Sequence, residues 1–177
     1  MNIPNKLTIL RIILVPFFVA AILYHKLEAA LVIFVLAALT DGFDGYIARV
    51  FNQKTHLGAV MDPIADKALI DCAYVSFSLV TDLPAYLHLP LYVPITVLSR
   101  DFIILVGISI LNSVVGKVDI KPTVLSKITT FFQMATITAL LVQFKFSPIL
   151  WNLTVLFTVV SGIDYIRIGA RLVNDKA

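Results

Sequence analysis

The stretch "LTDGFDGYIARVFNQKTHLGAVMDPIADKAL", residues 39–69, places a polar segment between apolar ones. Four aspartates, Asp41, Asp44, Asp62 and Asp66, stand there among apolar, helix-forming residues. An ionised carboxylate that is left unpaired in a bilayer costs several kcal/mol. The fold therefore has to explain what keeps four carboxylates together.

The composition around this stretch is that of a membrane protein. The chain has 177 residues, of which 59% are hydrophobic and 14% charged, and its mean hydropathy is +0.95. Soluble domains are nearer to about 45–50% apolar and about 25% charged. We therefore predict one integral membrane domain over residues 1–177. The net charge of +3 suits a surface facing anionic lipids, and we expect lipids, with no nucleic acid, as partners.

Hydropathy divides the chain into six helices. A membrane span needs about 20 mostly apolar residues. Such segments lie at 7–25, 29–51, 58–81, 90–113, 122–144 and 148–171. The first begins without a small-residue cleavage pattern, so we expect it to stay in the membrane. The predicted fold class is all-α, a bundle of six transmembrane helices.

Basic residues predict the orientation, because cytoplasmic ends of spans are enriched in Lys and Arg. Only Lys26 and Lys145 fall at one set of helix ends. The other set carries Lys6, Arg11, Arg49, Lys54, Lys117, Lys121, Lys127, Arg167, Arg171 and Lys176. We expect both termini and the 51–58 connection on the cytoplasmic side, with a polar cavity that opens there.

The four aspartates are spaced to converge. Asp41 and Asp44 are three residues apart and Asp62 and Asp66 are four apart, so each pair shares one helix face. The short connection at 51–58 predicts that the two helices are antiparallel neighbours. The four carboxylates should then meet at nearly one depth.

Convergence of four like charges requires a cation. A set of oxygen ligands without His or Cys favours a hard ion, Mg²⁺ or Mn²⁺, and one or two such ions suit a phosphate or pyrophosphate substrate. The small residues Gly42, Gly45, Ala48 and Gly58 would let a ligand approach closely, and Arg49 offers a planar fork of donors to phosphate.

Two alternatives remain open at this point. In one, the acids pair with nearby cations, among them Arg49 and Lys67, and the glycines only pack helices. In the other, the protein is a small ion transporter, although transporters more often distribute acids over several helices at the midplane, often in repeated halves.

The residues also resemble a known family, the CDP-alcohol phosphatidyltransferases. The matching pattern is Asp41-x-x-Asp44-Gly45-x-x-Ala48-Arg49, eight further residues, then Gly58-x-x-x-Asp62-x-x-x-Asp66. Three other stretches are similar to the same family: "NIPNKLTILRI" at 2–12, "SRD" at 99–101 and "KPTVLSKITTFFQ" at 121–133.

The resemblance implies a six-helix enzyme, usually a homodimer, of the bacterial or mitochondrial inner membrane, whose site opens to the cytoplasmic or matrix leaflet. It would transfer a phosphatidyl group from CDP-diacylglycerol to a hydroxyl and release CMP. Asp66 would be the general base beside the metal. The implied metal-binding residues are Asp41, Asp44, Asp62 and Asp66, and those for the CDP moiety are Gly45, Ala48, Arg49 and Gly58.

Two acceptors remain open, phosphatidylglycerol (a cardiolipin synthase) and glycerol 3-phosphate (a phosphatidylglycerophosphate synthase). The similar bacterial phosphatidylglycerophosphate synthases carry a second Arg eight residues after the one matching Arg100, and an additional Lys beside the one matching Lys127. Here Ile108 stands at the Arg position. Fewer cations suit a phosphodiester better than a dianionic phosphomonoester, so the sequence favours phosphatidylglycerol.

Arg100 and Lys127 are the predicted contacts for an acceptor or lipid phosphate, because an intramembrane cation is a functional candidate. Arg100 also has a structural interpretation, a pair with its neighbour Asp101, and Lys127 lies near enough to a helix start to reach water. Arg11 and Thr8 are expected to border the same cavity.

Overall fold

The computed structural model describes residues 3–50, 56–114 and 123–174, with side chains for 9–40, 67–111 and 123–172. This part of the chain forms six α-helices and no strand: α1 (Ile3–Leu23), α2 (Leu27–Val50), α3 (His56–Leu79), α4 (Tyr92–Val114), α5 (Val124–Leu141) and α6 (Ser147–Asn174). Every helix overlaps a predicted segment and its ends differ from the prediction by four residues or fewer. The all-helical prediction is confirmed.

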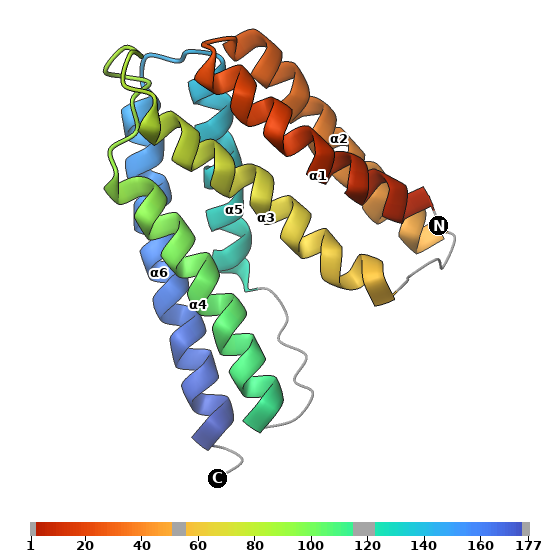
Figure 1. Ribbon diagram of the computed structural model, residues 1–177. Helices are drawn as coiled ribbons and strands as arrows, with labels where there is room; N and C mark the ends of the chain where they lie inside the picture. Colours follow the sequence, from red (N-terminus) through yellow and green to blue (C-terminus); the bar gives the residue numbers. More distant parts are fainter. Residues whose placement is uncertain (1–2, 51–55, 115–122, 175–177) are drawn as a thin grey trace.

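The helices form two groups, α1–α3 and α4–α6, and α2 connects them through a short contact with α5 while α3 connects them through α4 and α5. α1 packs along both α2 and α3, while α6 packs along α4 and α5, and α3 also meets α4 and α5 over shorter stretches. Figure 1 shows the helices gathered at one end of the molecule and spread apart towards the other. α2 and α3 run in opposite directions, as the sequence predicts, and α2 ends and α3 begins at the spread end (Figure 1).

Three of the helices are long and apolar enough to cross a membrane: Tyr92–Leu111 in α4, Val124–Leu141 in α5 and Ser147–Leu172 in α6. α1 and α2 contain shorter apolar stretches, Ile9–Leu23 and Leu27–Thr40. These results indicate a membrane protein. The full set of six spans remains a prediction.

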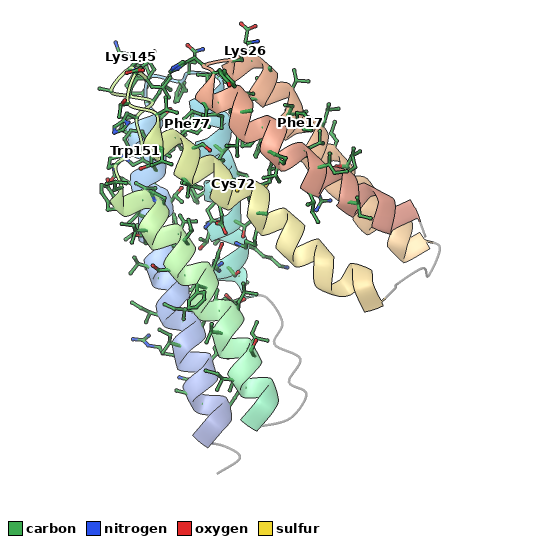
Figure 2. The ribbon with its side chains drawn as sticks, viewed as in Figure 1. Phe17, Lys26, Cys72, Phe77, Lys145 and Trp151 are labelled. Carbon is green, nitrogen blue, oxygen red and sulfur yellow. The ribbon has the colours of Figure 1, made fainter. Side chains whose placement is uncertain are left out.

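The outer surface is apolar, as expected for a bundle in contact with lipid. The neighbouring residues Phe17 and Phe18 show the contrast, since their side chains are 61% and 0% exposed. Figure 2 shows Phe17 on the outer side of α1. Large apolar side chains such as Ile95, Phe102 and Phe131 are likewise exposed. In water such a surface would drive association, whereas in a bilayer it is solvated by acyl chains.

The hydrophobic core lies towards the gathered end of the helices. Phe18 of α1 and Phe34 of α2 contact there with ring centroids 6.0 Å apart. Phe77 of α3 and Trp151 of α6 are buried in the same cluster, and Figure 2 places both near this end. Trp151 is thus a core residue. This packing fixes the gathered end and leaves the polar segment at the spread end.

Two tight turns reverse the chain at the gathered end. His25 and Gln143 follow α1 and α5 in the left-handed backbone region, with φ of 57° and 60°. After each of them the chain bonds back into the helix, from Lys26 N to Ala21 O and from Phe144 N to Ala139 O, both at 2.8 Å. These are the bonds of a Schellman motif, which satisfies the last carbonyls of a helix.

Candidate functional site

The two halves of the acid motif lie on α2 and α3, near the ends of these helices that reach the spread end of the molecule. Asp41 and Asp44 fall in the C-terminal half of α2, and Asp62 and Asp66 in the N-terminal half of α3. Because the two helices run in opposite directions, both pairs lie towards the same end. The side chains of these four residues, and those of Gly45, Ala48, Arg49 and Gly58, lie outside the described residues. Their contacts to metal and to the CDP moiety therefore stay predictions.

Arg11 is a buried cation at the meeting point of α1, α2 and α3. Only 2% of its side chain is exposed. It lines a cavity of about 100 Å³ together with Phe34 and Ala37 of α2 and Leu69 of α3. Ala37 of α2 stands four residues before Asp41, and Leu69 of α3 stands three residues after Asp66. This position supports the prediction that Arg11 borders the site, whereas the side chain of Thr8 lies outside the described residues.

Lys67, the residue after Asp66, forms an ion pair with a different helix. Its Nζ donates to Asp101 Oδ2 of α4 over 2.7 Å. The Lys67 side chain is 29% exposed and that of Asp101 only 5%. The alternative in which local cations neutralise the acid motif assigned Lys67 to those acids. In the structure this ammonium binds an acid that the motif does not contain.

Arg100 holds the other side of the same carboxylate. Its Nη1 donates to Asp101 Oδ1 at 2.7 Å, and its Nη2 donates to Ser126 Oγ of α5 at 2.8 Å and to Ser161 Oγ of α6 at 2.9 Å. The predicted pair of Arg100 with Asp101 is thus confirmed. A contact of Arg100 with phosphate stays a prediction. We call Lys67, Arg100, Asp101, Ser126 and Ser161 the Asp101 cluster.

The start of α5 positions Ser126 for this cluster. Thr123 is the N-cap, and its hydroxyl accepts a hydrogen bond from the backbone N of Ser126 at 3.1 Å. N-cap hydroxyls satisfy backbone donors of the first helical turn that otherwise lack partners. The cap therefore fixes Ser126 in the first turn, facing Arg100. Lys127, the next residue, is exposed, as expected for a side chain that reaches water.

Three residues at this site, Ser126, Ser161 and Tyr165, were not assigned a role from the sequence. Ser126 and Ser161 accept hydrogen bonds from Arg100, and the guanidinium carbon of Arg100 lies 5.5 Å from the centroid of the Tyr165 ring. Arg100 and Ser161 are 61 residues apart in the chain. A buried guanidinium needs several acceptors, and this need is the signal that could have directed attention to a serine on another helix.

Asp71 adds a fourth charged residue near the cluster. It lies one turn after Lys67 on α3 and interacts electrostatically with Asp101 and Lys67. Its Oδ1 is buried without a hydrogen-bond partner in the described part of the chain. Asp71 therefore adds no hydrogen bond to the Asp101 cluster through this oxygen.

Together, the fold and the site define an all-helical membrane protein with charged residues gathered inside its bundle. The sequence profile of the CDP-alcohol phosphatidyltransferases matches residues 1–160. The chain therefore belongs to the CDP-alcohol phosphatidyltransferase family, which confirms the resemblance seen in its aspartate motif.

Three relatives illustrate the range of the family that is similar to this chain. The CDP-diacylglycerol--glycerol-3-phosphate 3-phosphatidyltransferase of Bacillus subtilis is 33% identical, and the match covers 93% of each chain. A probable phosphatidylglycerophosphate synthase of Mycobacterium tuberculosis is 33% identical over 98% of this chain and 83% of its own. The cardiolipin synthase (CMP-forming) of Rattus norvegicus is 33% identical over 98% of this chain and 63% of its own.

Proposed function

We propose that this enzyme transfers a phosphatidyl group from CDP-diacylglycerol to the hydroxyl of a glycerol-based acceptor and releases CMP. The observation that carries the proposal is the arrangement of the family's aspartate motif. Its two halves lie on α2 and α3, which run in opposite directions and bring both acid pairs to one end of the molecule. Membership of a family of phosphatidyltransferases favours this activity over ion transport.

The charge balance of α3 supports a divalent metal at the motif. The helix contains three aspartates and one lysine, and that lysine, Lys67, binds Asp101 of α4. Carboxylates without His or Cys partners fit Mg²⁺ or Mn²⁺. One or two ions would be held by Asp41, Asp44, Asp62 and Asp66. A bound ion supplies positive charge to the pyrophosphate of the donor and to the departing phosphate.

The other functions assigned to the motif are proton transfer and binding of the nucleotide. Asp66 accepts the proton of the acceptor hydroxyl, whose oxygen then attacks the phosphorus of the phosphatidyl group, and the bond from that phosphorus to the CMP oxygen breaks. Arg49 donates to a phosphate of the nucleotide. The small residues that allow the CDP moiety to approach are Gly45, Ala48 and Gly58.

For the acceptor we propose phosphatidylglycerol. Ile108 occupies the position of the second cation expected for glycerol 3-phosphate, and it lines an apolar cavity of about 310 Å³ between α4 and α6 with Ile104, Leu111 and Tyr165. Arg100 already donates to one carboxylate and two hydroxyls, and its Nε lacks a hydrogen-bond partner in the described part of the chain. Few cations thus remain for a dianionic phosphomonoester. Arg100 and Lys127 stay the predicted contacts for a lipid phosphate.

Glycerol 3-phosphate is the second candidate acceptor. The observation in its favour is that the relatives of Bacillus subtilis and Mycobacterium tuberculosis are named for the synthesis of phosphatidylglycerophosphate and match this chain as well as the cardiolipin synthase does.

A competition assay separates the two acceptors. Purified protein receives CDP-diacylglycerol, Mg²⁺ and equal concentrations of phosphatidylglycerol and glycerol 3-phosphate, and the lipid products are separated by mass. We expect cardiolipin as the main product. Phosphatidylglycerophosphate as the main product would reverse the acceptor assignment and leave the phosphatidyl transfer intact.

The proposal includes six spans, a homodimer and a cytoplasm-facing site with both termini on that side. Lys26 and Lys145 lie at the gathered end of the helices (Figure 2). The excess of Lys and Arg towards the spread end favours that end as the cytoplasmic one. Labelling of single cysteines at residues 26 and 172 in inverted vesicles tests this orientation.

A further inference from the structure

α3 carries half of the acid motif on a section that diverges from α4. It packs mainly along α1 and meets α4 and α5 over shorter stretches. Figure 1 shows α3 and α4 diverging towards the N-terminal end of α3, where Asp62 and Asp66 fall. Since the chemistry requires Asp66 within hydrogen-bond reach of the acceptor hydroxyl, the position of this section relative to α4–α6 has to be fixed.

We propose that the ion pair of Lys67 with Asp101 is the positioning element that fixes the acid-bearing section of α3 relative to α4, α5 and α6. The inference rests on the proposed function, because it concerns the reaction that Asp66 serves. Lys67 and Asp101 are positioning residues in this account. Neither of them contacts the substrate.

The geometry of Asp101 supports this role. Its two oxygens bind cations from two helices, Oδ2 accepting from Lys67 and Oδ1 from Arg100, both at 2.7 Å. The carboxylate is therefore held in one orientation between α3 and α4. Because only 5% of it is exposed, these bonds lie in a medium of low dielectric constant, where they are stronger and more directional than at a wet surface.

The far side of the cluster is anchored as well. Arg100 donates to Ser126 and Ser161, so a continuous series of four hydrogen bonds leads from α3 through α4 to α5 and α6. Gly162 of α6 lies beside the aliphatic part of Arg100, where a Cβ would make an ordinary van der Waals contact of 3.6 Å with Arg100 Cγ. Lys67 thus joins α3 to a preassembled anchor on the other three helices.

The link begins next to the predicted base. Lys67 directly follows Asp66, so a displacement of α3 at Lys67 moves Asp66 by a comparable distance. A misplacement of about 1 Å can cost on the order of 100-fold in rate even when binding is preserved. Loss of the pair should therefore lower kcat more than it raises KM.

The test compares CMP release by four variants of the 177-residue chain at varied concentrations of CDP-diacylglycerol. Lys67→Met removes the cation and keeps the aliphatic stem, Lys67→Arg keeps the charge, and Asp101→Asn removes the acceptor charge with little change of shape. Thr154→Val is the matched control, since it breaks the buried bond of Thr154 with Thr136 on the same pair of helices as Ser161 and Ser126. Melting temperature is measured for each variant.

We expect kcat to fall about 10-fold or more in Lys67→Met and Asp101→Asn with KM within about 3-fold, to be mostly restored in Lys67→Arg, and to stay within about 2-fold in Thr154→Val. Combining Lys67→Met with Asp101→Asn should lower kcat by little more than either change alone. If Lys67→Met is not recovered folded, Lys67→Gln replaces it with the same expectation.

Three results would overturn the positioning role: unchanged kcat in the folded Lys67 and Asp101 variants, a loss that appears in KM alone, or fully additive losses in the double variant. Absence of CMP release from the unchanged protein would instead refute the proposed function. The two failures are therefore distinguishable.

Discussion

α3 and α4 are of nearly equal length, 24 and 23 residues, but their charged residues differ in sign balance and in pairing. In α4 the charges are adjacent in sequence, opposite in sign and buried against each other, as Arg100 and Asp101. In α3 three aspartates accompany one lysine, and that lysine binds α4. The charges of α4 are balanced by the protein itself, whereas we propose that the acids of α3 are balanced by a bound divalent cation.

The difference distinguishes a structural use of charge from a chemical one. A buried ion pair that satisfies its own hydrogen bonds holds helices together and needs no ligand. An excess of carboxylates within a bilayer has to be protonated or joined by a cation, and carboxylates that stay ionised predict a metal or a cationic substrate. The following variants test whether the two helices differ in this way, from the largest expected effect to the smallest.

Asp66→Asn on α3 should abolish most of the activity. The amide cannot accept the proton of the acceptor hydroxyl, and general base catalysis contributes about 10²–10⁴-fold. We expect kcat for CMP release to fall by about that factor, with the melting temperature of the protein nearly unchanged. Full turnover in this variant would remove Asp66 from the role of base.

Asp101→Ala on α4 should act first on stability. It leaves the guanidinium of Arg100 and the ammonium of Lys67 near each other without their shared carboxylate. Breaking a buried pair in this way costs about 3–5 kcal/mol. Chemical unfolding in detergent micelles measures the change. A loss below about 1 kcal/mol would show that the Asp101 cluster contributes little to the fold.

Thr154→Val should have a small effect on stability. The hydroxyls of Thr154 and Thr136 are hydrogen-bonded to each other at 2.8 Å, and the Thr154 hydroxyl also donates to Phe132 O at 3.0 Å. Both threonines are fully buried. Hydrogen bonds between membrane helices average about 0.6 kcal/mol. We expect a loss of about 1 kcal/mol in the same unfolding experiment, well below that of Asp101→Ala.

Gly107→Ala on α4 should stabilise the protein slightly. A Cβ at this position meets nothing within 4 Å. Alanine in a helix interior is favoured over glycine by about 0.5–1 kcal/mol. A gain of about 0.5 kcal/mol without loss of CMP release is the expected outcome. A clear loss of activity would show that a ligand or a second subunit contacts this surface.

The helices could be predicted from the sequence because long apolar segments between turn residues are a strong local signal. Their ends shift by a few residues, since capping by Thr123 and the left-handed turns at His25 and Gln143 decide the boundaries. The adjacent pair of Arg100 with Asp101 was also predictable, because both residues stand side by side in the chain.

The rest of the cluster depends on tertiary contacts that a single sequence does not reveal. Lys67 stands beside the acid motif, and one alternative from the sequence paired it with those acids, but its partner Asp101 is 34 residues away. Ser126 and Ser161 read as ordinary small polar residues of apolar helices. Only the packing of α4 between α3 and α6 brings them to one guanidinium.

The most direct test of the account is CMP release from CDP-diacylglycerol by the purified protein with Mg²⁺ or Mn²⁺ and after chelation by EDTA. The account predicts release with phosphatidylglycerol present, its loss on chelation and its return when either ion is added back. Equal release with and without chelator would contradict the claim that the aspartates of α2 and α3 work through a bound divalent cation.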